Sequence, residues 1–234
     1  MKKQSTLFLI ALLGMILSSC GEVKYTAISE DEFNSYYTEE KATKAKEDIE
    51  ALSTFSFIMG QNGNGFEYNV NTFVDVNYYY EYGKLYVGPN HKDNREGEFL
   101  YLANESNTAD YYEHYIGEEK NHETGADVYK DYLESVSDVK DTILNALTSP
   151  TYLLTQYGYK EGYKYFKGSD NSIKVSAEVT HEDQTLIGYA TYDANTLYPK
   201  SFSAQVYEEA IYTITFSFEA NPKIRHKTPQ DLGF

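Results

Sequence analysis

The chain has 234 residues and a formal net charge of -16 at pH 7, because 36 acidic residues outnumber 20 basic ones. This charge repels phosphate backbones and the lysines are scattered, so we expect no nucleic-acid partner. One cysteine excludes an internal disulfide framework and any cysteine-rich metal site, whereas 41% hydrophobic residues suffice for the core of one domain.

The first 20 residues have the pattern of a bacterial secretion signal. Lys2 and Lys3 precede an apolar run of eleven residues, 7–17. A bilayer core of about 30 Å needs roughly 20 helical residues, so this run is too short to remain as a membrane helix. The segment Leu17-Ser18-Ser19-Cys20 resembles the lipobox of bacterial lipoproteins, which implies cleavage before Cys20 and acylation of that cysteine. The alternative is an ordinary secretory signal with a chance cysteine.

The lipobox resemblance implies a signal peptide at 1–19 and a lipidated tether at 20–29. The rest of the chain has no clear repeat, proline-rich linker or composition break, so we expect a single domain at 30–234. Acyl chains contribute about 0.8 kcal/mol per buried CH₂, so two or three of them anchor a protein firmly. We therefore expect a monomer held by Cys20 at the extracytoplasmic face of the cell membrane. Because residues 1–19 contain two lysines and no acid, cleavage takes the net charge from -16 to -18.

The first half of the predicted domain begins with helices and continues with strands. Ser29 followed by Glu32 fits a capping box, and Thr38 before two glutamates is a second helix start. Helical spacing of apolar residues then extends to Leu52. Alternating residues and turn signals next predict strands at 55–58, 66–76, 78–82, 85–87 and 99–102, with a charged loop at 90–98. Residues 103–125 are polar and are predicted to form an exposed loop with one helical turn.

The second half of the chain returns to helix and then to strands. Apolar residues at helical spacing from Tyr129 to Leu147 predict a helix, and Ser149-Pro150 ends it and starts a short helix through Leu154. Alternating runs then predict strands at 159–166, 173–179, 185–192, 197–207 and 211–218. Short turns between successive strands indicate antiparallel pairing.

This order of elements resembles the LolA-like lipoprotein-carrier family, which includes the LppX and LprG-type lipid carriers. The resemblance rests on four segments: Thr54-Phe55-Ser56-Phe57 after the first helices, Ser149-Pro150-Thr151-Tyr152-Leu153-Leu154, the hairpin 192–200, and Tyr212 to Phe218 followed by Pro222 and Pro229. It implies an α+β fold in which a curved antiparallel sheet, a half-barrel, packs on a few helices around an apolar cavity. The chain departs from the family in its acidity, its 25 tyrosines and its polar segment 103–125.

The family resemblance implies binding of a hydrophobic or lipid-like ligand. Residues that would line such a cavity alternate along the predicted strands, namely Phe55, Phe57, Phe66, Tyr68, Ile173, Val175, Tyr212, Ile214, Phe216 and Phe218. The alternative function is surface adhesion, in which exposed tyrosines recognise a glycan or a protein. Tyrosines also suit a half-buried sheet for purely structural reasons.

Catalytic motifs are sparse in this chain. Ser137 and Lys140 fit Ser-x-x-Lys, but the companion motifs of penicillin-binding enzymes are missing and Ser137 lies in a predicted helix. His114, Glu118 and His122 are four apart, a spacing that could hold a metal ion on one helix face, but Gly117 weakens a helix there. We therefore expect no enzymatic activity, no metal site and no cofactor.

Overall fold

The structure is a computed structural model that describes residues 23–63, 66–87, 93–115, 117, 120–181, 184–206, 210–217 and 226–234. The predicted signal segment, including Cys20, lies outside the described residues.

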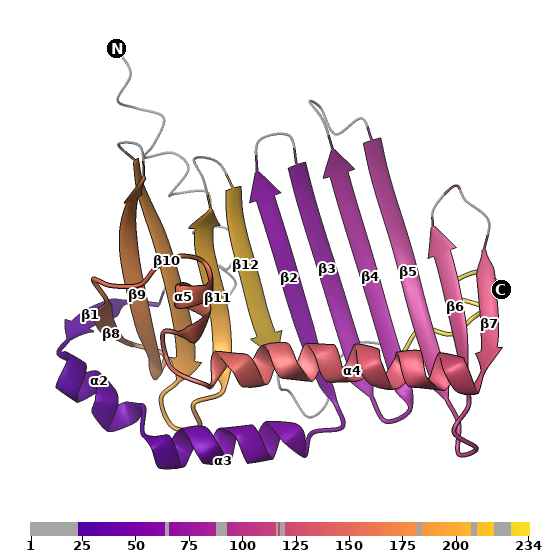
Figure 1. The fold of residues 1–234 in the computed structure, drawn as a ribbon, viewed down its shortest axis with the longest axis horizontal. Helices are drawn as coiled ribbons and strands as arrows, with labels where there is room; N and C mark the ends of the chain where they lie inside the picture. Colours follow the sequence, from indigo (N-terminus) through magenta and orange to yellow (C-terminus); the bar gives the residue numbers. More distant parts are fainter. Residues whose placement is uncertain are drawn as a thin grey trace.

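The described strands form one antiparallel sheet in the order β1-β8-β9-β10-β11-β12-β2-β3-β4-β5-β6-β7. The sheet is curved and does not close (Figure 1), so the predicted α+β class with a curved antiparallel sheet packed on a few helices is confirmed. The strands are β1 (Tyr25–Ile28), β2 (Phe55–Gly63), β3 (Phe66–Asp75), β4 (Tyr78–Val87), β5 (Asp93–Ala103), β6 (Ala109–Tyr115), β7 (Asn121–Gly125), β8 (Lys164–Gly168), β9 (Ser172–His181), β10 (Gln184–Asp193), β11 (Pro199–Val206) and β12 (Ala210–Ser217).

The sheet consists of β1 at one edge and two runs of sequential strands, β8 to β12 and β2 to β7, in which each strand pairs with the next one along the chain. Strand β12 joins them by pairing with β2, with Phe216 opposite Phe57 and Ile214 opposite Met59. The pairing brings together segments more than 150 residues apart in the chain.

Four described helices lie on one face of this sheet, and Figure 1 shows α4 crossing the strands near one end of their length. They are α2 (Glu30–Tyr36), α3 (Glu39–Glu50), α4 (Ala126–Ala146) and α5 (Tyr152–Gln156). Both predicted helix starts are confirmed, because the Ser29 hydroxyl accepts the Glu32 N–H at 3.1 Å and Thr38 accepts that of Lys41 at 3.3 Å. Among the described residues, none of these helices is long and apolar enough to cross a bilayer.

The main core lies between the helices and the sheet. Its fully buried side chains come from both the helices and the sheet. They include Phe33, Ile49, Phe55, Ile143, Leu154, Ile173 and Phe202. Tyr192 of β10 is also buried, and its hydroxyl donates to the carbonyl oxygens of Ala146 at 3.0 Å and Pro150 at 3.2 Å. The first bond satisfies a carbonyl at the end of α4, and the second holds the segment between α4 and α5 against the sheet.

A second, smaller core lies on the opposite, outer face of the sheet. Phe73, Tyr78, Tyr80 and Leu100 pack there with Leu232, which belongs to the C-terminal segment 226–234. The backbone N–H of Lys227 in the same segment donates to the Tyr78 hydroxyl at 2.8 Å. The C-terminal segment therefore covers part of the face that carries no helix.

Several sequence predictions are wrong in detail. The strand predicted at 159–166 begins only at Lys164, and the strands predicted at 78–82 and 85–87 form one strand, β4. The segment 103–125, predicted as an exposed loop, contains β6 and β7, because its tyrosines pair across the sheet and Tyr111 packs on Tyr101 with ring centroids 4.6 Å apart. The predicted tether 20–29 contains β1, which pairs with β8 and so begins the folded part at Tyr25. Strand β5 begins at Asp93, inside the predicted loop 90–98, because backbone pairing with β4 continues through charged residues.

The hydrogen bonds of Asp193, in the turn between β10 and β11, predict how the free energy of unfolding depends on pH. The Asp193 carboxylate accepts the backbone N–H groups of Asn195 and Thr196, both at 2.9 Å. Burial alone would raise the pKa of Asp193, but these hydrogen bonds outweigh it and lower the pKa. The ionised carboxylate therefore stabilises the fold above the unfolded pKa of about 3.9, and the contribution is lost as pH falls through the lowered folded pKa.

We expect Asp193→Ala to lower the free energy of unfolding by about 1 kcal/mol at pH 7 and by less near pH 3. Urea denaturation at the two pH values measures both differences. Asp141→Ala, at an exposed site on α4, is the control and should change little at either pH. An equal loss for Asp193→Ala at both pH values would show that its charge does not matter.

Candidate functional site

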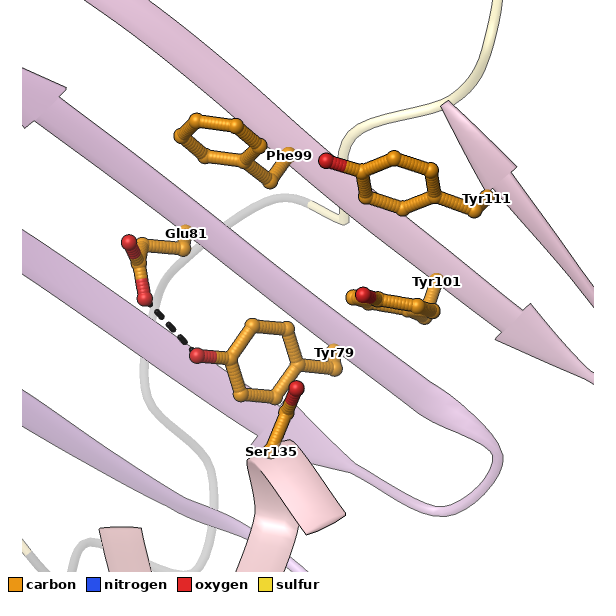
Figure 2. Close-up of a pocket in the computed structure, with 6 residues that line it drawn as sticks. All are labelled: Tyr79, Glu81, Phe99, Tyr101, Tyr111 and Ser135. Carbon is orange, nitrogen blue, oxygen red and sulfur yellow. Dashed lines mark hydrogen bonds between the residues drawn. The ribbon is translucent and has the colours of Figure 1, made fainter. Parts of the chain in front are cut away.

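A pocket of about 170 Å³ lies on the helix-covered face of the sheet, where α4 meets β4, β5 and β6. Four aromatic rings, one carboxylate and one hydroxyl line it, from Tyr79, Glu81, Phe99, Tyr101, Tyr111 and Ser135 (Figure 2). We call it the tyrosine pocket.

The strand register explains why these side chains meet. Tyr79 is opposite Tyr101, which is opposite Tyr111, so the three tyrosines form a row across β4, β5 and β6. Glu81 and Phe99 are opposite each other two residues further along, and residues two apart share a face of a sheet. Ser135 comes from α4, and Figure 2 shows it beside the rings of Tyr79 and Tyr101.

The rings stand at angles to one another rather than in a single stack. Tyr79 and Tyr101 meet edge to face, with centroids 5.8 Å apart and an interplanar angle of 80°. Tyr101 and Tyr111 are tilted by 35°. Such a row presents both ring faces and hydroxyl groups to a ligand.

Carboxylates make the pocket electronegative. The Tyr79 hydroxyl donates to Oε2 of Glu81 at 2.7 Å, and in Figure 2 the other carboxylate oxygen points away from this bond. Burial first, and then the charge of Glu81, raises the pKa of Tyr79, while burial and Glu113 raise that of Tyr111. The phenols therefore stay neutral at physiological pH, and the negative potential favours a cation over an anion.

Gly97 permits the aromatic packing at the border of the tyrosine pocket. A Cβ at this position would lie 2.9 Å from ring carbons of Tyr115 and 3.3 Å from the Phe99 ring. Without that atom, Tyr115 packs edge to face on Phe99 with centroids 5.4 Å apart. The position of Phe99 in the pocket wall thus depends on the absence of a side chain at Gly97, two residues earlier in β5.

The structure places most of the predicted cavity residues at register positions on the helix-covered face. Three of them, Phe55, Ile173 and Val175, are buried in the main core. For Phe57, Phe66, Tyr68, Tyr212, Ile214 and Phe216 only the backbone is described, and Phe218 lies outside the described residues. None of the ten lines the tyrosine pocket.

His114 and His122 do not share a helix face. His114 lies on β6 and His122 on β7, where its ring stacks on Tyr112 with centroids 4.4 Å apart, while Glu118 is outside the described residues. Within the described part of the chain, no three His, Cys, Asp or Glu side chains cluster in a way that could hold a metal ion. Lys140 of the Ser-x-x-Lys pair donates to the carbonyl oxygen of Glu50 at 2.9 Å, which joins α4 to the end of α3.

Sequence reasoning missed the tyrosine pocket. It treated Tyr111 as part of a loop and had no means of bringing Ser135 of α4 next to β4 and β5. The available signal was the alternation of aromatic and acidic residues in 79–81 and 111–113, which places ring and carboxylate on one face of a strand.

Comparison with protein-family models and with curated proteins finds no match for this chain.

Proposed function

We propose that this protein is a membrane-anchored lipoprotein that binds a small organic cation in the tyrosine pocket. The observation that carries the proposal is the lining itself, with four aromatic rings around a space that also contains the Glu81 carboxylate. Aromatic faces attract cations through the ring quadrupole, by about 2 kcal/mol where the cation is desolvated. The carboxylate adds a compensating charge, as a desolvated cation requires.

The pocket size supports a small ligand group. At about 170 Å³ it is below the roughly 300–1,000 Å³ of pockets that enclose a whole drug-sized molecule. It can accept an alkylammonium head group, whereas a long acyl chain needs more room. Binding of a lipid tail along the predicted half-barrel stays a prediction, and extraction of the native protein with organic solvent followed by mass spectrometry tests it.

The proposed anchor rests on the chemistry of the N-terminal sequence. An apolar run ends in Leu17-Ser18-Ser19-Cys20, and Cys20 is the one cysteine of the chain. Mass spectrometry of the membrane-extracted protein should find acyl chains on an N-terminal Cys20. An unmodified Cys20, or a chain that still begins at Met1, would contradict the anchor without affecting the proposed ligand.

The pocket proposal predicts binding that depends on charge. Choline and its uncharged isostere 3,3-dimethylbutan-1-ol have the same shape, so isothermal titration should detect choline and give much weaker binding of the isostere. Tyr101→Ala should weaken choline binding about tenfold or more, because a desolvated cation–π contact is lost. Glu81→Gln should weaken choline binding while leaving that of the isostere unchanged.

Two matched variants serve as controls for these measurements. Tyr163→Ala removes a tyrosine between α5 and β8, and Glu105→Gln removes an exposed carboxylate from the turn between β5 and β6. Both should bind choline like the unaltered protein. Equal affinity for choline and its isostere, or equal loss in pocket and control variants, would contradict the proposal.

A further inference from the structure

We infer that the outer face of the sheet at its β1 end rests on the bilayer surface to which Cys20 is attached. The inference rests on the proposed acylation and adds an orientation to it. The contact surface, which we call the aromatic–lysine face, consists of Tyr25, Phe166, Lys174, Ile187 and Tyr189 on β1, β8, β9 and β10.

The length of the tether brings this end of the sheet close to the membrane. Because β1 begins at Tyr25, only five residue steps separate Cys20 from the sheet. A fully extended chain covers at most about 3.6 Å per residue, so Tyr25 lies within about 18 Å of the acylated cysteine. A tether as long as the sequence predicted would have left the domain free to tumble.

The aromatic–lysine face is built around one cation. Nζ of Lys174 lies 3.9 Å from the ring centroid of Tyr25, 4.6 Å from that of Phe166 and 5.9 Å from that of Tyr189. No carboxylate in the described part of the chain is within ion-pair distance of this nitrogen. Ile187, on the same outer face of β10, is 47% exposed.

These residue types suit the border between lipid and water. Aromatic rings with a polar tip concentrate at that level of a bilayer, and lysines place their stems in the apolar part while their amines reach phosphates. The three rings around Lys174 partly exclude water from its amine, and this burial lowers the pKa of Lys174. Since no described carboxylate pairs with this ammonium group, it can donate to a lipid phosphate.

The distribution of charge favours this end of the sheet. On the outer face, β8 and β9 carry two lysines and one glutamate, whereas β4 to β7 carry three acidic residues and one lysine there. The acidic residues of α2 lie on the other face, since Phe33 of that helix packs on Tyr165. An anionic headgroup layer therefore attracts the β1 end and repels the opposite end.

The single cysteine and the absence of tryptophan allow a direct test. The chain from Cys20 onward, coupled through Cys20 to a maleimide lipid in phosphatidylcholine–phosphatidylglycerol vesicles, carries the anchor whether or not the cell adds one. Phe166→Trp supplies the only tryptophan, within the aromatic–lysine face. Its fluorescence should shift to the blue and be quenched by brominated lipids. Tyr189→Trp is a second reporter if the first variant folds poorly.

Control variants distinguish contact of the aromatic–lysine face with the bilayer from attachment through Cys20 alone. Val76→Trp, at an exposed turn between β3 and β4, should not be quenched. Adding Lys174→Met to the Phe166→Trp chain should reduce the docked-to-undocked ratio about fivefold, as expected for one lysine at an anionic surface. Lys130→Met, at the start of α4, should have no such effect. Unquenched Phe166→Trp and Tyr189→Trp, or quenching equal to that of Val76→Trp, would overturn the inference even if native Cys20 is acylated.

Discussion

Deletion of residues 226–234 should lower the free energy of unfolding by at least about 3 kcal/mol, measured by urea denaturation. This C-terminal segment inserts Leu232, 1% exposed, between Phe73, Tyr78 and Leu100 on the outer face of the sheet. Removing it exposes apolar surface there and leaves the Tyr78 hydroxyl without the N–H of Lys227. The described helices all lie on the other face, so they cannot cover the gap.

Single substitutions distinguish the loss of the Leu232 side chain from the loss of the whole segment 226–234. Leu232→Ala should account for most of the loss, because truncation of a buried leucine to alanine typically costs about 2–5 kcal/mol. Leu232→Met keeps the volume and should cost less than about 1.5 kcal/mol. Gln230→Ala, in the same segment but exposed, should change stability by less than about 0.5 kcal/mol. A deletion as stable as the intact chain would show that the segment is not part of the folded domain.

Gly188→Ala should destabilise the protein by about 1–3 kcal/mol, because the added methyl group has no room. A Cβ on Gly188 of β10 would lie 2.7 Å from Cδ2 of Leu154 and 2.9 Å from the ring of Tyr159. Both neighbours are buried, and the Tyr159 hydroxyl is held by the carbonyl oxygen of Gln205 at 2.8 Å. Neither side chain can move aside without breaking other contacts of the core.

Gly83→Ala is the matched control, on the same face of the sheet in β4. There the nearest atom to an added Cβ is Cγ2 of Val70 at 3.8 Å, an ordinary contact distance. Replacing a strand glycine by alanine at a compatible site stabilises by about 0.4–1 kcal/mol, because the unfolded chain loses freedom. Thermal unfolding should thus show opposite shifts for the two variants. A similar shift of the unfolding temperature in both variants would mean that α5 does not pack tightly against β10 at Gly188.

Local signals predicted much of this fold. Ser29 and Thr38 start helices by accepting backbone N–H groups three residues ahead, and this depends on no distant part of the chain. Alternation likewise predicted the strands from β9 to β12, which are joined by short turns, whereas the strand predicted at 159–166 begins only at Lys164. Alternation is weak in 103–125, where the polar composition predicted a loop. Strand β6 nevertheless forms there, because Tyr111 packs on Tyr101 of the neighbouring strand β5.

The tyrosine pocket could not be predicted in the same way. Tyr79, Tyr101 and Tyr111 share a row only because β4, β5 and β6 pair in one register, and Ser135 arrives from a helix that packs across them. A sequence shows which residues alternate, but the partner strand decides which side chains become neighbours.

The sequence by itself determined the acidity, the predicted attachment at Cys20 and the periodicities that set the α+β class, because each depends on residues close together in the chain. Only the tertiary structure decided that β12 pairs with β2, that residues 226–234 cover the outer face and that four rings meet around Glu81. The physical reason is that these contacts are between residues far apart in sequence, and they form only where burial and strand pairing together outweigh the entropy of closing long loops.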